Sequence, residues 1–231
     1  MKMIVTRPQY DTTTKYLSVW AAEVINFAKK KSIEVFDLCK DKANKKDFTG
    51  RVKKLKPDVI FLNGHGNDNC VTGHDEEKLV EVGDNHDILH GAITYALSCN
   101  SGKILGPKVV ESNQATYIGY EDKFIFVWDS NYSTRPQDDL MAKPFMEASN
   151  QVMISLLKGN RAGEASEKSK NKFKEHFMKL SSSQADPDSL QAAQCLWWNM
   201  RNQVCLGDLD AELKEFAAKL GVKPSNPLQA D

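Results

Sequence analysis

Hydrophobic residues in this chain occur in short runs that alternate with longer amphipathic stretches. The runs are rich in β-branched and aromatic residues and are bounded by Gly, Pro or polar residues, which is typical of strands buried in a sheet. The predicted strands are Met3–Thr6, Ile33–Leu38, Val59–Leu62, Ile93–Leu97, Ala115–Gly119 and Gln203–Asp208, with Phe124–Trp128 as a candidate edge strand. Helical stretches separate the first three strands. The pattern therefore predicts an α/β fold that opens as a βαβαβ unit.

The longer stretches carry apolar residues at helical spacing. After the first strand, one face collects Leu17, Trp20, Ala21, Val24 and Phe27–Ala28, as in a helix packed on a sheet. Further predicted helices are Asp47–Leu55, Asp84–Leu89, Gly102–Glu111, Phe145–Leu157, Ala162–Leu180, Leu190–Trp198 and Leu209–Leu220.

The remaining segments are polar. Within the polar segment Asn67–Gly91, Cys70–Val82 is predicted to form a small hairpin or lid. Ser181–Pro187 reads as a linker, and residues 224–231 as a frayed end. With 231 residues, the chain is predicted to be one domain over residues 1–221, followed by a flexible tail over 222–231.

Composition excludes several classes of protein. Lys plus Arg and Asp plus Glu both number 31, so no net charge attracts the chain to nucleic acid or to anionic lipid. No apolar run approaches the length of a signal peptide core or a membrane span, which predicts a cytoplasmic protein. Five cysteines without CxxC spacing argue against a disulfide framework and fit a reducing compartment.

Two of the predicted strands end in reactive side chains. His65-Gly66 follows Val59–Leu62, and Cys99 follows Ile93–Leu97. Catalytic groups gather beyond the carboxyl ends of parallel strands, so adjacent strands would bring an imidazole and a thiol together. Cys99 would be the nucleophile and His65 its general base, and the Gly66 and Cys99 amides could donate to an oxyanion. The dipole of the following helix would lower the pKa of Cys99.

These residues resemble the caspase-like cysteine peptidases of clan CD, in which one apolar strand ends His-Gly and a later one ends in Cys. The sequence Ala96-Leu97-Ser98-Cys99-Asn100-Ser101-Gly102 is closest to CHAT-domain and gingipain-like members. Tyr117–Tyr120, Leu196-Trp-Trp-Asn199 and Leu206-Gly-Asp208 look like later parts of the same family, so the resemblance covers residues 3–208. It implies an α/β/α sandwich with a mostly parallel sheet of about six strands. It also implies endopeptidase activity on proteins or peptides without a metal or other cofactor.

The resemblance does not carry specificity over, because the chain lacks the caspase Gln-Ala-Cys-Arg-Gly signature. Leu97 also stands where metacaspases carry an acidic residue. Glu121, Asp122 or Asp129 could pair with a basic P1 side chain, whereas Arg7 would favour an acidic or polar one. The alternative for all four residues is that they are charged loop residues exposed to solvent, with no role in specificity. The Glu121-Asp122 pair favours a basic P1 residue.

Other interpretations of the same residues remain open. Cys99 could be a buried core thiol. The spacing of Cys70, His74, His86 and His90 could describe a zinc site, and Asn63–Gly66 could bind a phosphate although it lacks both phosphate-loop patterns. The chain could also be a catalytically silent module that binds a protein partner. A peptidase of this kind could need an activating protein or ligand that orders residues 67–87 and 129–139. The oligomeric state stays open.

Overall fold

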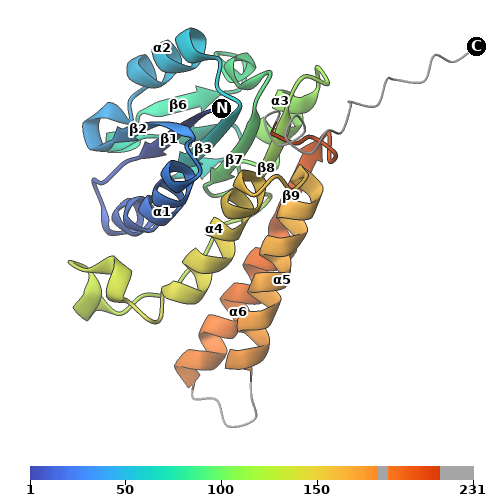
Figure 1. Ribbon diagram of the computed structural model, residues 1–231. Coiled ribbons are helices and arrows are strands. Elements are labelled where there is room, and N and C mark those ends of the chain that lie inside the picture. Colours follow the sequence, from blue (N-terminus) through green and yellow to red (C-terminus); the bar gives the residue numbers. More distant parts are fainter. Residues whose placement is uncertain (182–186, 214–231) are drawn as a thin grey trace, which may run out of the picture.

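Six strands form the central sheet of the computed structural model, in the order β2-β1-β3-β7-β8-β9 (Figure 1). The structure describes residues 1–181 and 187–213. All neighbouring strands run parallel except β9, which is antiparallel to β8. Their bounds are β1 Lys2–Arg7, β2 Glu34–Cys39, β3 Val59–Asn63, β7 Ile93–Leu97, β8 Thr116–Tyr120 and β9 Gln203–Gly207. The predicted α/β class and the six-stranded, mostly parallel sheet are confirmed.

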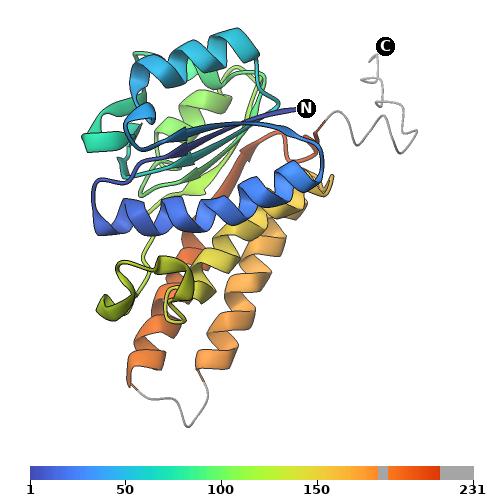
Figure 2. The same cartoon turned by 60° about the vertical axis from the view of Figure 1, so that its left-hand side comes forward.

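Helices cover both faces of the sheet. Side chains alternate along each strand, so in β3 Val59 and Phe61 face one core while Ile60 and Leu62 face the other. The first core packs against α1 (Thr12–Lys30), α4 (Lys143–Leu157), α5 (Ala162–Leu180) and α6 (Pro187–Asn202). The second packs against α2 (Lys45–Leu55) and α3 (Leu105–Val110). Figure 2 shows α1 crossing one face and α2 the other, which is the predicted α/β/α sandwich.

The helix predicted after the first strand forms as α1. Its predicted face is buried at Leu17, Trp20, Ala21, Val24 and Ala28. The α5–α6 hairpin extends beyond the sheet in both views (Figures 1 and 2). Of the helices within the described residues, none is both long and apolar enough to cross a membrane.

A second, three-stranded antiparallel sheet follows β3. It consists of β4 (Gly66–Asn67), β5 (Cys70–Thr72) and β6 (Lys78–Glu81), so the predicted hairpin is confirmed. Its first turn is tied to the chain after Cys99, because Asp68 O accepts the Leu105 N–H at 2.9 Å and the Asp68 carboxylate lies 3.1 Å from Lys103 Nζ. The small sheet is therefore fixed against the turn that follows β7.

Three elements differ from the sequence prediction. Residues 124–128 are extended but form no strand, because Asn199 of α6 occupies the backbone groups of Ile125 that a neighbouring strand would use. Helix α3 begins only at Leu105, since residues 100–104 form a turn. Residues 209–213 are not helical, which contradicts the start of the predicted last helix. Residues 214–220 of that helix, the core of the linker (182–186) and the tail lie outside the described residues.

Candidate functional site

The ends of β3 and β7 lie side by side. The two strands pair in parallel from Val59↔Ile93 to Asn63↔Leu97, and Gly64 N donates to Leu97 O at 3.4 Å. Both strands then turn at the carboxyl edge of the sheet, where His65 follows one and Cys99 the other. The structure thus brings the predicted base and the predicted thiol to neighbouring strand ends.

Gly66 makes the closest contact between the two turns. A Cβ atom added to Gly66 would lie 2.9 Å from Cys99 O, 3.0 Å from Ser98 Oγ and 2.9 Å from Cys70 O. Those separations are shorter than ordinary carbon–oxygen contacts, so only glycine lets the two backbones approach this closely. The glycine after His65 therefore sets the spacing between the His65 turn and the Cys99 turn.

The imidazole of His65 is held by a carboxylate that the sequence analysis did not identify. His65 Nε2 lies 2.6 Å from Asp11 Oδ2, and the imidazole side chain is 35% exposed. On the backbone, His65 O accepts the Thr72 N–H at 2.9 Å. The Tyr10 ring meets the His65 ring edge-on, with 6.1 Å between centroids. These contacts fix both the backbone and the ring of His65.

Asp11 is itself fixed by helix α1, of which it is the N-cap. Its Oδ1 accepts hydrogen bonds from both the backbone N–H and the hydroxyl of Thr14, each at 2.7 Å. Burial favours the neutral carboxyl, but the hydrogen bonds from Thr14 and His65 outweigh it and lower the pKa of Asp11. An Asp directly before the first residue of the helix that follows β1 is the sequence signal that could have identified it.

The thiol of Cys99 is half-buried and points to a different partner. Its Sγ lies 3.9 Å from Phe124 O, and no hydrogen bond joins His65 to Cys99 in the part of the chain that the structure describes. Burial raises the pKa of Cys99, although the nearby Lys123 charge opposes the rise. The prediction that the following helix lowers this pKa is wrong, because α3 is short and starts only at Leu105.

Some of the backbone N–H groups around Cys99 already donate hydrogen bonds within the protein. Asn100 has a positive φ of 60° and its N–H donates to Asp122 O at 3.1 Å, while the Gly102 N–H donates to Tyr120 O at 2.8 Å. Within residues 1–181 and 187–213, the Cys99 N–H donates to no protein acceptor. The Cys99 N–H thus has no acceptor among these residues, and Gly66 lies against the same turn.

The segment that covers the thiol is held by α6. Trp198 Nε1 donates to Lys123 O at 3.0 Å. The fully buried Asn199 donates to Ile125 O at 2.6 Å and accepts the Ile125 N–H at 2.9 Å. The Trp-Trp-Asn motif therefore positions Phe124 beside Cys99, a function that the sequence did not reveal.

The four predicted specificity residues are placed differently. Asp122 is half-buried and close enough to Cys99 for its charge to raise the thiol pKa, whereas Glu121 is exposed. The Asp129 carboxylate caps a short 3-10 turn by accepting the Asn131 N–H at 2.9 Å. Arg7 is paired with Asp37 within the fold. Of the four, only Asp122 acts electrostatically on the thiol.

Arg7 ends β1 and pairs with a carboxylate of the neighbouring strand. Its Nε donates to Asp37 Oδ1 at 2.8 Å, and its Nη1 donates to Ser18 O at 3.1 Å. The hydrogen bonds to Asp37 raise the pKa of Arg7. Because the guanidinium is 15% exposed and already paired, the contacts of Arg7 do not favour recognition of an acidic P1 residue.

An open hollow of about 770 Å³ adjoins the Asp11 carboxylate. Tyr10, Lys15, Lys40 and His74 contribute to its lining. It lies at the carboxyl edge of the sheet, next to the residue that holds His65. The hollow therefore lies beside the carboxylate that contacts the His65 imidazole.

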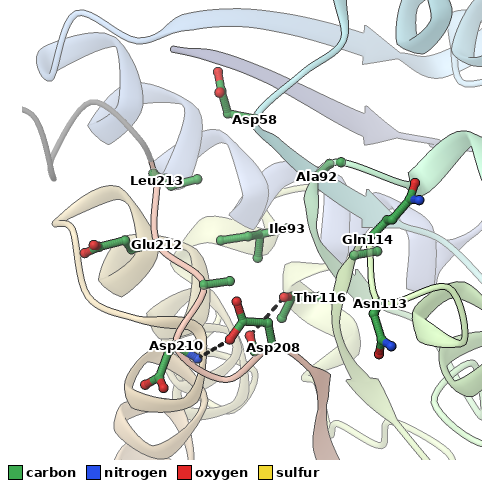
Figure 3. Close-up of a pocket in the computed structure, with 13 residues that line it drawn as sticks. Asp58, Ala92, Ile93, Asn113, Gln114, Thr116, Asp208, Asp210, Glu212 and Leu213 are labelled. Carbon is green, nitrogen blue, oxygen red and sulfur yellow. Dashed lines mark hydrogen bonds between the residues drawn. The ribbon is translucent and has the colours of Figure 1, made fainter. Parts of the chain in front are cut away.

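A separate hollow of about 420 Å³ lies at the opposite edge of the sheet (Figure 3). Ile93 and Thr116, at the starts of β7 and β8, line it together with Asp208. Asp208 is bound to its surroundings, because its backbone O accepts the Thr116 hydroxyl at 2.9 Å and its Oδ1 accepts the Asp210 N–H at 2.9 Å. This hollow is remote from His65 and Cys99.

The four residues of the zinc alternative have separate partners. His74 Nδ1 accepts the Gln9 N–H at 3.4 Å, and His86 Nδ1 accepts the Gly83 N–H at 3.3 Å. His90 Nε2 lies 3.2 Å from Ser112 Oγ, and Cys70 is buried in the small sheet. Across the described residues, no three His, Cys, Asp or Glu side chains gather as metal ligands.

Comparison with known proteins identifies no relative: no protein-family model matches the chain, and a search of curated proteins gives no significant match.

Proposed function

We propose that this protein is a cysteine endopeptidase with a caspase-like dyad, in which Cys99 is the nucleophile and His65 the general base. The observation that supports this most directly is the register of β3 and β7, which places both residues just beyond paired strand ends. The close contact of Gly66 with the backbone of Cys99 adds to it. A thiol and an imidazole at this edge of a parallel sheet are the two groups that acyl transfer requires.

Reaction begins with the neutral thiol, because burial raises the pKa of Cys99. The thiol leaves Phe124 O and transfers its proton to His65 as sulfur attacks the carbonyl carbon of the scissile bond. The N–H of Cys99 donates to the oxyanion that forms. The protonated His65 then gives its proton to the departing amine, and water hydrolyses the acyl-enzyme. No prosthetic group takes part in these steps.

The proposed substrate is a protein or peptide, cleaved after a basic residue. Asp122 supports this preference because it is the acidic residue that acts on the Cys99 thiol. Lys123 lies close to the same thiol and would oppose a basic side chain, so the preference depends on which of the two the P1 side chain approaches. A cytoplasmic site of action is part of the proposal.

A second candidate function is a catalytically silent caspase-like module that binds a protein partner. The specific observation in its favour is that the Cys99 thiol is bonded to Phe124 O and not to His65. The same contact would also describe an enzyme held inactive until a protein or ligand moves the segment over the thiol. Covalent labelling of Cys99 by a substrate-like probe distinguishes an active peptidase from a catalytically silent module.

The test is intact-mass analysis after reaction with acyloxymethyl-ketone peptides that carry Arg, Lys, Asp or Leu at P1. We expect one adduct on the wild type, formed fastest with Arg or Lys. Cys99→Ala should abolish it, and His65→Ala should slow it by about 10²- to 10⁴-fold, the usual contribution of a general base.

Cys70→Ala is the matched control, since Cys70 is a buried thiol in the adjoining small sheet. It should leave the adduct unchanged. An adduct that persists in Cys99→Ala, or that forms equally fast in His65→Ala, would contradict the proposed dyad. Fastest labelling with the Asp or Leu probe would contradict the basic preference alone.

A further inference from the structure

The N-terminus of helix α1 delivers a carboxylate to Nε2 of the His65 imidazole. The two Asp11 oxygens divide their contacts: Oδ1 accepts from Thr14, and Oδ2 lies 2.6 Å from His65 Nε2. Thr14 is fully buried, so the carboxylate is anchored to the body of the helix and has one oxygen left for His65. The orientation of Asp11 is thus set by the fold itself and does not depend on a bound substrate.

This contact decides which nitrogen of His65 carries hydrogen. An ionised carboxylate only accepts hydrogen bonds, and the lowered pKa of Asp11 keeps it ionised at neutral pH. A neutral imidazole has one N–H, so a 2.6 Å contact with Asp11 places that hydrogen on Nε2. The lone pair that can take up a proton is then on Nδ1.

We propose that Asp11 is a positioning residue for His65, which fixes the imidazole in the Nε2–H tautomer and leaves Nδ1 to accept the proton of Cys99. The inference rests on the proposed function for the role of His65 as base. During attack the Sγ–H bond breaks, an Nδ1–H bond forms, and the sulfur electron pair bonds to the substrate carbonyl carbon. The resulting imidazolium keeps its Nε2–H on Asp11, so the carboxylate stabilises the charge that appears there.

The experiment is ¹⁵N NMR of the histidine side chains in the full chain, with His65→Ala to assign the His65 resonances. We expect the wild type to show the Nε2–H tautomer. Asp11→Asn should lose that preference, because an amide can either accept from or donate to Nε2. Asparagine caps helices as well as aspartate, so helix α1 should be retained.

Thr14→Val is the control for a merely structural effect. It removes the hydroxyl, which donates to Asp11 Oδ1 and accepts the Tyr10 and Asp11 N–H groups, but it keeps the Thr14 backbone N–H that binds the same carboxylate. The Nε2–H tautomer should be preserved. Asp11→Asn should also slow active-site labelling by roughly 10- to 100-fold, as for the loss of a group that orients a catalytic or ligating histidine.

The two proposals fail in different ways. Unchanged His65 resonances in Asp11→Asn would overturn the positioning role, whatever the labelling shows. An altered tautomer in Asp11→Asn together with an unlabelled wild type would support the Asp11–His65 pairing and count against the peptidase. An altered tautomer with normal labelling of Asp11→Asn would overturn the positioning role in the reaction.

Discussion

Asn199 and Ile125 form a closed pair of hydrogen bonds in which the buried side-chain amide of Asn199 binds both backbone groups of Ile125. The arrangement imitates the pairing of two strands, but it is made by one side chain of α6. It holds the extended segment whose Phe124 carbonyl contacts the Cys99 thiol. The stability of α6 and the exposure of the thiol are therefore connected.

Replacing Asn199 by Leu should lower the free energy of unfolding by about 2–3 kcal/mol, because two partly buried backbone groups of Ile125 lose their hydrogen-bond partner. The loosened segment should also expose Cys99, so alkylation of that thiol should become faster. Urea denaturation and peptide mapping after iodoacetamide treatment measure the two effects.

Trp198→Phe is the matched variant, since it removes only the indole bond to Lys123 O. Its loss of stability should be smaller, about 1 kcal/mol, because Trp198 is partly exposed and water can replace the indole. Equal Cys99 alkylation rates in Asn199→Leu and the wild type would show that α6 does not control access to the thiol.

Gly66→Ala should separate the two turns of the candidate site. The added methyl would meet the backbone oxygens of Cys70 and Cys99 at 2.9 Å, and neither oxygen can move without displacing β5 or the turn that follows β7. We expect a loss of about 1–3 kcal/mol in stability, as for overpacking, together with slower labelling of Cys99.

Gly50→Ala adds the same methyl group at a position where no neighbouring atom would contact it. Gly50 lies inside α2, and a Cβ there has no atom within 4 Å. It should be neutral or stabilise the protein by up to about 1 kcal/mol through helix propensity. Equal effects of the two substitutions in thermal denaturation and labelling would contradict the close-contact argument.

The strand ends that carry His65 and Cys99 could be predicted because apolar runs define buried parallel strands and because parallel strands end at one edge. Asp11 and Asn199 could not. They reach the site from helices distant in sequence. A helix-capping Asp or a buried Asn looks the same in sequence whether it only stabilises its helix or also contacts a site. The extended segment at residues 124–128 has strand-like residues, but its hydrogen bonds come from a side chain that no local pattern identifies.

The lowered pKa of Asp11 predicts a stability difference that depends on pH. The folded pKa lies below the ordinary value of about 4, so the ionised carboxylate stabilises the fold above pH 4 and this contribution is lost as pH falls through the lower folded value. Since the side chain is 38% exposed and screened by water, we expect Asp11→Asn to be less stable by only about 0.5 kcal/mol at pH 7. Urea denaturation should show the stabilities of the two proteins converging as pH falls below about 4, and a gap that widens with acidification would contradict this sign.

The raised pKa of Cys99 predicts slow reaction of the resting thiol with a small alkylating reagent. Only the thiolate reacts rapidly, and burial raises the pKa of Cys99 above the ordinary cysteine value of about 8.5. The rate of iodoacetamide modification at Cys99 should therefore stay low at pH 7.5 and rise at a higher pH in the folded protein than in urea, where the same thiol should react near pH 8.5. Peptide mapping resolves Cys99 from the other four cysteines. Rapid modification of the folded protein at pH 7.5 would mean that a thiolate is present before substrate binds, and that the proton has left Cys99 ahead of the attack.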